Sequence, residues 1–433
     1  MAKTQASKRW TIMVYLCGDN NLDAAGIADV TEMKQVGSSA DINVLAQVDR
    51  AGSKSKTTRY YLQKGTSLAK DAVQSLGETN MGDPRVLADF LTWGIKNYPA
   101  DHYMVVLWNH GAGWDDSNIY TGGDAFGGAP PPIMRKGIML RGSARAATRG
   151  ALNSRNVAIG VHRARRALFA STVKNAVTRG IAFDDEAKDF LDNVEMKRVL
   201  MGVKKALKRK IDILGFDACL MSMAEVAYQV KGAVNFSVGS EETEPNEGWP
   251  YNRVLKALAA KPAMTPRDLA AIVVTQYLAS YGTNENVTQA AADLSQLDGL
   301  AAAIDKLAKA LRAAMGDSAV HSALMTARAQ VQEYEPPYDE YCDLVDLCSL
   351  ISHHANKADI TTACDGVKAA VAKAVINAGA KGKAVANSHG LSIYFPKKKL
   401  CSLYATLDFA KKNAWSAFLA DYVASTSRRP ALG

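Results

Sequence analysis

Two continuous apolar segments of strand length limit the folds that this chain can adopt. Residues 10–16 read WTIMVYL and residues 103–108 read YMVVLW. Strands buried on both faces of a parallel sheet have this composition, because helices cover each face. Residues 42–48, 211–216 and 234–238 are weaker candidates of the same kind. We therefore expect a mostly parallel central sheet.

Helical patterns separate these segments. Asn20 or Asn21 is placed to cap one helix, and Asp83 followed by Pro84 is the N-cap and first-turn signature of a second. A third apolar periodicity runs from Met196 to Leu207. Strands that alternate with helices predict an α/β/α arrangement, in which ligand sites lie at the carboxyl ends of the strands.

The length of 433 residues exceeds the size at which one hydrophobic core stops growing. We expect an α/β domain over residues 1–260 and a mostly helical domain over residues 261–433, with a late strand at 391–395 that returns to the sheet.

No apolar run reaches 18 residues and the first nine residues are polar and basic, which predicts neither a membrane span nor a signal peptide. A cytoplasmic location is expected unless an upstream signal precedes this sequence. Six cysteines without a CxxC pair predict free thiols.

The net charge of +9 is concentrated in one segment. Residues 125–183 contain no Asp or Glu but eleven Lys and Arg residues, and without these the rest of the chain carries a net charge of −2. Glycines and prolines introduce the segment, and its apolar residues have no sustained period. This pattern predicts a mobile, exposed insertion between two elements of the sheet, which is also a target for proteases.

Two reactive side chains follow predicted strands. His110 comes just after the strand that ends at Trp108, and Cys219 just after the strand that begins at residue 211. A thiol needs a base or a cationic neighbour to act as a nucleophile at neutral pH, and imidazole is the usual one. The alternative is that Cys219 is an inert buried residue and that His110 is a polar residue whose hydrogen bonds are all made within the protein.

Other chemistries fit less well. The sequence HGAG at 110–113 is similar to an esterase oxyanion loop, but the chain lacks the G-x-S-x-G elbow of that fold. Cys348, His353 and His354 lack a second ligand pair for zinc. No P-loop or GxGxxG motif occurs.

Seven segments resemble the clostripain family of cysteine peptidases, which belongs with caspases, gingipains, legumains and separase. The similarity runs in order along nearly the whole chain, through WTIMVYLCGDNNLD (10–23), LGETNMGDP (76–84), LWNHGAGW (107–114), IAFDDEAKDFLDNVEMKRVL (181–200), FDACLMSMAEVAYQV (216–230), VGSEETEPNEGWPY (238–251) and HGLSIYFP (389–396). This resemblance implies a caspase-like α/β/α sandwich and a cysteine endopeptidase.

The resemblance also implies roles for individual residues. His110 in the NHG motif would be the catalytic histidine, and Cys219 in the DAC motif the nucleophile. Asp217 would lie at the base of the S1 pocket and select Arg or Lys at P1, since a carboxylate makes bidentate contacts to a guanidinium. The backbone N–H groups of Cys219 and of the Gly111 loop are the natural oxyanion donors.

Members of the family are typically precursors that cut themselves after a basic residue between the histidine and cysteine strands. The preferred junctions here follow Arg141, Arg145, Arg149 and Arg179, each of which precedes a small residue. The product would be a heterodimer of light and heavy chains, and without cleavage a monomer is expected. The alternative is that the segment is only a solvated basic loop, and its length departs from what is usual for such a linker.

The acidic residues Glu241, Glu242 and Glu244 follow the predicted strand at 234–238. They are expected to bind a cationic substrate or a calcium ion, which some relatives need, because hard carboxylate oxygens suit Ca²⁺. A solvated charge run is the alternative. No cofactor is required by the expected chemistry, and the expected partners are protein or peptide substrates with Arg or Lys at P1, not a membrane.

Two other functions stay open on the sequence. The basic segment suggests a nucleic-acid-binding protein, but its aromatic residues Phe126, Phe169 and Phe183 are not interleaved with the arginines, and no nucleic-acid-binding motif is present. The second is a catalytically inactive, peptide-binding relative of the family.

Overall fold

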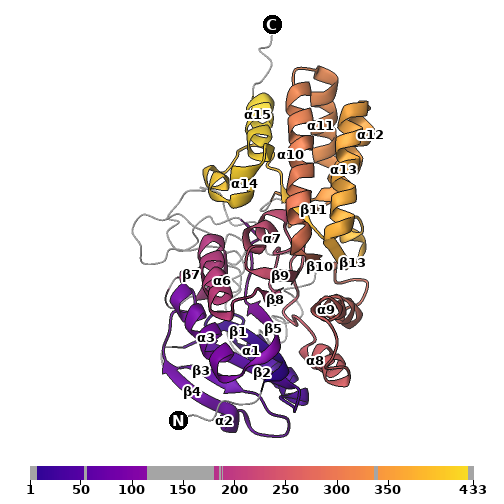
Figure 1. Ribbon diagram of the computed structural model, residues 1–433. Coiled ribbons are helices and arrows are strands. Elements are labelled where there is room, and N and C mark those ends of the chain that lie inside the picture. The colour runs from indigo at the N-terminus through magenta and orange to yellow at the C-terminus, as the bar shows by residue number, and fades with distance from the viewer. Residues whose placement is uncertain are drawn as a thin grey trace, which may run out of the picture.

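A nine-stranded sheet forms the centre of the protein (Figure 1). The computed structural model describes residues 7–52, 56–114, 180–184, 187, 189–335 and 340–427. The strands lie in the order β13 (Val375–Lys381), β10 (Val287–Asp293), β9 (Val234–Gly239), β8 (Ile211–Asp217), β5 (Ala100–Trp108), β1 (Lys8–Gly18), β2 (Ile42–Arg50), β3 (Thr57–Tyr61) and β4 (Ala72–Gly77).

The middle of this sheet is parallel, as the apolar segments predict. Strands β9, β8, β5, β1 and β2 pair in parallel, whereas β3 and β4 on one side and β10 and β13 on the other pair antiparallel. All five segments that the sequence proposed as buried strands are members of the parallel part. Their carboxyl ends therefore meet at one edge of the sheet.

Helices cover both faces of the sheet. Because side chains alternate along a strand, β1 contributes Met13 and Tyr15 to one hydrophobic core and Val14 and Leu16 to the other. The first core packs under α3 (Pro84–Asn97), α6 (Asn193–Leu207) and α7 (Ala224–Val230). The second packs under α1 (Asp23–Val36), α8 (Tyr251–Ala260) and α9 (Pro266–Ser280). The α/β/α sandwich expected from the sequence is the observed architecture.

The observed N-cap of α3 is the one predicted from the sequence, whereas the N-cap of α1 is a different residue. Asp83 is the N-cap of α3, where its side chain accepts a hydrogen bond from the Arg85 amide. The N-cap of α1 is Leu22, without a side-chain cap, so the prediction that Asn20 or Asn21 caps this helix is wrong. Asn20 Oδ1 instead accepts from the Leu22 amide at 2.8 Å and closes the turn before the helix. Asn21 is left with its side chain exposed.

Residues after 260 contribute to the central sheet as well as to a helical region. Strands β10 and β13 come from this part of the chain. The predicted late strand is β14 (Ser392–Tyr394), which pairs with β12 (Tyr341–Asp343) and β11 (Glu333–Tyr334) in a separate three-stranded sheet and not with the central one. The Ser392 amide donates to the carbonyl of Ser222 at 3.0 Å. This bond ties the small sheet to the segment that follows Cys219.

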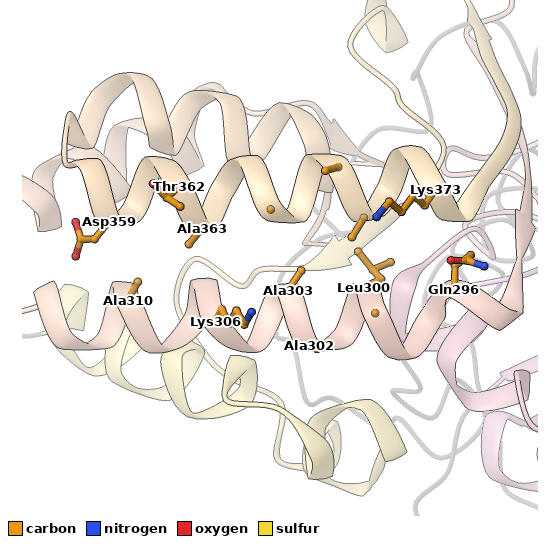
Figure 2. Close-up of a pocket in the computed structure, with 14 residues that line it drawn as sticks. Gln296, Leu300, Ala302, Ala303, Lys306, Ala310, Asp359, Thr362, Ala363 and Lys373 are labelled. Atoms are coloured by element: carbon orange, nitrogen blue, oxygen red, sulfur yellow. The ribbon is translucent and has the colours of Figure 1, made fainter.

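The helical region stands beside the sheet, with α10 (Leu297–Ala314), α11 (Ser318–Gln330), α12 (Leu344–Ala355) and α13 (Ala358–Ala374) packed together (Figure 1). A groove of about 690 Å³ runs between α10 and α13, lined mainly by small residues such as Ala303 and Ala370 (Figure 2). The remaining elements are short or peripheral: α2 (Leu68–Asp71), β6 (Gly180–Asp184), β7 (Asp189–Asp192), η1 (Leu294–Gln296), η2 (Lys383–Val385), η3 (Ser402–Thr406), α14 (Asp408–Lys412) and α15 (Trp415–Ser427).

Candidate active site

Two neighbouring parallel strands carry the predicted catalytic residues to the same place. Trp108, the last residue of β5, is the register partner of Asp217, the last residue of β8. The Asn109 amide extends the contact by donating to the Asp217 carbonyl at 3.3 Å. His110 and Cys219 each lie two residues beyond this level, and both line one cavity of about 40 Å³. The structure thus brings together the pair that the sequence singled out.

The backbone at Gly111 lies directly against that of Cys219. A Cβ atom built on Gly111 would lie 2.3 Å from the Cys219 carbonyl oxygen and 3.1 Å from its amide nitrogen. No side chain fits at that distance, so only glycine permits this approach. The contact fixes the spacing between the loop that carries His110 and the loop that carries Cys219.

The imidazole of His110 is held by a residue from the loop that follows the neighbouring strand β1. Its Nε2 lies 2.8 Å from Oδ1 of Asn21. Because an amide oxygen only accepts hydrogen bonds, this contact favours the tautomer that carries its proton on Nε2. Burial lowers the pKa of His110 to about 4, which keeps the ring neutral at neutral pH.

The thiol of Cys219 is bonded to the main chain of Glu244. The Glu244 amide donates to Sγ at 3.3 Å, and Sγ donates to the Glu244 carbonyl at 4.0 Å. Burial raises the pKa of the Cys219 thiol to about 12, and the neighbouring acidic side chains act in the same direction. In this arrangement the sulfur is a protonated thiol and its proton is directed at Glu244.

Asp217 forms the floor of the same cavity. Its carboxylate is only 4% exposed and accepts hydrogen bonds from the Tyr251 hydroxyl at 2.8 Å and the Trp249 amide at 3.4 Å. Burial raises the pKa of Asp217 to about 6, against the lowering effect of its hydrogen bonds to Glu244 and Tyr251. Asp217 is therefore a buried acidic group at the cavity, which suits the binding of a cation.

The three predicted glutamates do not act as one group. Glu241 points away from the cavity, since its Oε2 accepts from the Gly390 amide at 2.8 Å, and it lies beside Asp343. Glu242 is partly exposed. Only Glu244 lines the cavity, where its side chain lies beside Asp217 and accepts from Gln289 at 3.1 Å. Burial and the charge of Asp217 raise the pKa of Glu244 well above its ordinary value.

The carboxylates of these three glutamates do not fit a shared calcium site. In the described part of the chain, the group of three acidic ligand atoms that lie within 4.8 Å of one another is Asp19, Asp49 and Glu78. Asp19 and Glu78 come from the loops that follow β1 and β4, and Asp49 lies near the end of β2. A calcium requirement stays a prediction.

Four of the predicted residues lie outside the described residues: Arg141, Arg145, Arg149 and Arg179. The same is true of nearly all of the basic segment at 125–183. The larger groove between α10 and α13 contains none of the predicted catalytic residues (Figure 2).

Sequence reasoning missed Asn21, Tyr251 and Asp29 as parts of this site. The sequence pattern predicts a helix cap at Asn20 or Asn21, but Asn21 also follows β1, whose carboxyl end adjoins that of β5. Asp29 lies on α1, where Trp108 Nε1 donates to it at 2.6 Å, and burial raises its pKa to about 9, with the charge of Asp217 as the next cause. Only the packing of α1 and α8 on the sheet brings Asp29 to Trp108 and Tyr251 to Asp217, two residues that line the cavity.

Comparison with known proteins places this geometry in a family. The model of the clostripain family matches residues 14–126 and 169–422. Clostripain of Hathewaya histolytica is 26% identical over 419 residues, which cover 81% of this chain and 67% of that protein.

Solved structures share the fold. An inactive zymogen of a C11 protease from Parabacteroides distasonis aligns with a TM-score of 0.61 and 20% identity over 94% of this chain and 99% of that one. The secreted C11 cysteine protease iotapain from Bacteroides thetaiotaomicron aligns with a TM-score of 0.64 and 15% identity, over 95% of this chain and 100% of that one. The expected caspase-like sandwich is confirmed by these similarities.

No helix among the described residues is both long and apolar enough to span a bilayer. The compartment of this chain stays a prediction. The match of the family model extends over most of the sequence and includes both loops that carry His110 and Cys219. This chain therefore belongs to the clostripain family and is a cysteine peptidase.

Proposed function

We propose that the protein is an endopeptidase that cleaves after Arg or Lys, with Cys219 as nucleophile and His110 as its base, and that it cleaves itself within the basic segment. The observation that carries the proposal is the cavity shared by His110, Cys219 and Asp217. It places a thiol, an imidazole and a buried carboxylate at the ends of two paired strands.

The S1 assignment is supported by charge. Asp217 and Glu244 both line the cavity, whose described lining contains no Lys or Arg. A substrate cation bound there satisfies buried carboxylates that water reaches poorly. Arginine and lysine are the two side chains that supply such a cation at neutral pH.

The chemical steps follow from the positions of the two side chains. A P1 cation held by Asp217 directs the following carbonyl carbon to Cys219. His110 takes the proton of the thiol, and the sulfur attacks the carbonyl carbon to form a tetrahedral intermediate. The protonated imidazole then gives its proton to the leaving amine, which yields a thioester acyl-enzyme and a free amine product. Water deprotonated by the neutral imidazole hydrolyses the thioester and restores the thiol.

The close contact of Gly111 with Cys219 supports an oxyanion site between them. In the proposed geometry the amides of these two residues donate to the developing oxyanion, and each such donor is worth on the order of 3 kcal/mol in the transition state. The separation of their backbones is set by the absence of a side chain at Gly111.

Self-cleavage is tested with wild type and Cys219→Ala purified in parallel, with and without added calcium. Intact-mass measurement is expected to show that wild type splits after an Arg or Lys between residues 135 and 179 while the variant stays whole. Cys401→Ala, which removes another partly exposed thiol, is the matched control and is expected to split like wild type. If wild type stays whole under both conditions, self-processing is wrong, and hydrolysis of an arginine ester decides whether the uncut chain is active.

A further inference from the structure

Glu244 contacts two parts of the active site at once. Its main-chain amide and carbonyl hold Sγ of Cys219, at 3.3 Å and 4.0 Å. Its side chain lies beside Asp217 on the floor of the cavity. One residue therefore links the expected position of the substrate cation to the nucleophile.

The side chain of Glu244 is incompletely satisfied. Oε1 accepts from Gln289 at 3.1 Å, whereas the buried Oε2 makes no hydrogen bond of good geometry among the described residues, and the carboxyl group lies near the Asp217 carboxyl group and the indole N–H of Trp249. The Oε1 atom of Gln289 is also buried without a hydrogen-bonding partner among the described residues. Buried acceptors in a native structure are nearly always bonded. Glu244 lines the cavity beside Asp217, so its under-bonded acceptor points to a ligand that carries N–H donors.

The cavity must widen to admit that ligand. Its volume of about 40 Å³ has room for only a few water molecules, which is less than an arginine side chain needs. The loop that bounds it is anchored on both sides of Glu244. The Glu242 amide donates to Thr288 Oγ1 at 3.0 Å, and the Gly248 carbonyl accepts from the Tyr281 hydroxyl at 2.6 Å. Displacement of the loop is therefore confined to residues 243–247.

We propose that Glu244 gates the nucleophile: a P1 cation that enters between Asp217 and Glu244 displaces Glu244, and this movement withdraws its main-chain groups from Cys219 and frees the thiol to meet His110. The inference rests on the proposed Arg/Lys specificity and adds to it a reason why the resting thiol is unreactive. The S–H group is directed at the Glu244 carbonyl in the free protein, while Nε2 of His110 is engaged by Asn21. Binding of the correct side chain is thus coupled to assembly of the catalytic pair.

The gate is tested by the rate at which iodoacetamide alkylates Cys219, followed by peptide mass mapping. The rate is measured with saturating n-butylguanidinium, which mimics the P1 side chain but has no scissile bond, and with n-butylurea, its neutral isostere. We expect the guanidinium to raise the alkylation rate of Cys219 roughly tenfold relative to the urea, within the usual range of coupling between two sites. An equal or lower rate with the guanidinium overturns the gate.

Two variants locate the coupling. Glu244→Gln keeps the shape of the side chain but cannot become a carboxylate, so the ratio of the two rates is expected to fall to about one. Glu247→Gln removes an acidic group from the same loop at an exposed position and is expected to keep the wild-type ratio. If Glu244→Gln keeps the wild-type ratio, Glu244 is not the gate.

Peptidase activity measured in parallel separates this inference from the proposed function. The alkylation assay reports binding and thiol reactivity without turnover. A wild-type protein that cleaves arginine substrates but has a rate ratio of one contradicts the gate and leaves the proposed function standing. A protein that has the elevated ratio but cleaves no arginine substrate supports the gate and contradicts the proposed function.

Discussion

Trp108 and Asp217 are register partners at the carboxyl ends of the adjacent strands β5 and β8. This pairing sets the position of the site, because the histidine and the cysteine follow at the same distance along each strand. It also explains why Asp217 is both a sheet residue and a pocket residue: its backbone belongs to the ladder and its carboxylate to the cavity floor. The geometry leads to four predictions.

Gly111→Ala is expected to lower kcat strongly, because the added methyl group would collide with the Cys219 backbone at 2.3 Å. The two loops must separate, and misplacement of a catalytic pair by about an ångström costs on the order of 10²-fold in rate. Peptidase kinetics with an arginine substrate and circular dichroism check this. Gly202→Ala is the control, because its Cβ meets nothing within 4 Å and the change stabilises the interior of α6. Equal activity of the two variants would contradict the proposed closeness of the loops.

Asn21 is a positioning residue for His110, held at 2.8 Å. Asn21→Ala is expected to lower kcat by roughly tenfold with little change in KM, as loss of one hydrogen bond that orients a catalytic ring implies. Asn21→Asp restores the acceptor and adds a charge that favours the imidazolium, so it should raise the pKa of His110 and move the acid limb of the kcat/KM profile to higher pH. A pH profile for Asn21→Asp that coincides with wild type would show that Asn21 acts on the fold alone.

Asp217→Asn is expected to reduce kcat/KM for peptides with Arg at P1 by roughly 10²–10³-fold, since one partner of a buried ion pair is removed. Matched peptides with citrulline at P1 keep the shape of arginine but lack its charge. The value of kcat/KM for these peptides should change little in Asp217→Asn, and any decrease measures an effect unrelated to charge. An equal decrease for both peptides would mean that Asp217 supports the structure and does not select the cation.

Stability should depend on pH through Asp217. The pKa of this carboxyl is raised from 3.8 to about 6 in the folded protein. The folded state therefore holds more protons than the unfolded state between these values, and stability falls as the pH rises through this window. Asp217→Asn removes the effect, so the Tm of this variant should rise relative to that of wild type between pH 3.5 and pH 7.5.

A control of opposite sign accompanies this measurement. The side-chain hydrogen bond from Lys231 lowers the pKa of Asp298. Ionised Asp298 therefore stabilises the folded state at pH values above the ordinary pKa of an aspartate. Asp298→Asn should therefore lose Tm relative to wild type as the pH rises through that value. Thermal unfolding of the three proteins across this range checks both directions. A Tm difference between Asp217→Asn and wild type that does not vary with pH would refute the assignment of Asp217 as an acid of raised pKa.

From the amino-acid sequence alone we predict the parallel core of the sheet, the helices on its faces, and the positions of His110 and Cys219 at strand ends. These properties follow from local patterns, because an apolar run of strand length needs cover on both faces and a residue just after such a strand lies at its carboxyl edge. The resemblance to a family added the roles of the residues, which periodicity does not contain.

The polar groups that meet around the cavity could not be predicted from local patterns. Glu241 and Glu244 are three residues apart, yet one faces Gly390 and the other Asp217, because the loop after β9 turns between them. Asn21 reaches His110 because β1 lies beside β5, and Tyr251 reaches Asp217 because α8 packs on the sheet. Contacts between segments this far apart in the chain depend on strand order and helix packing, and those are set by burial of the whole core and not by any local pattern.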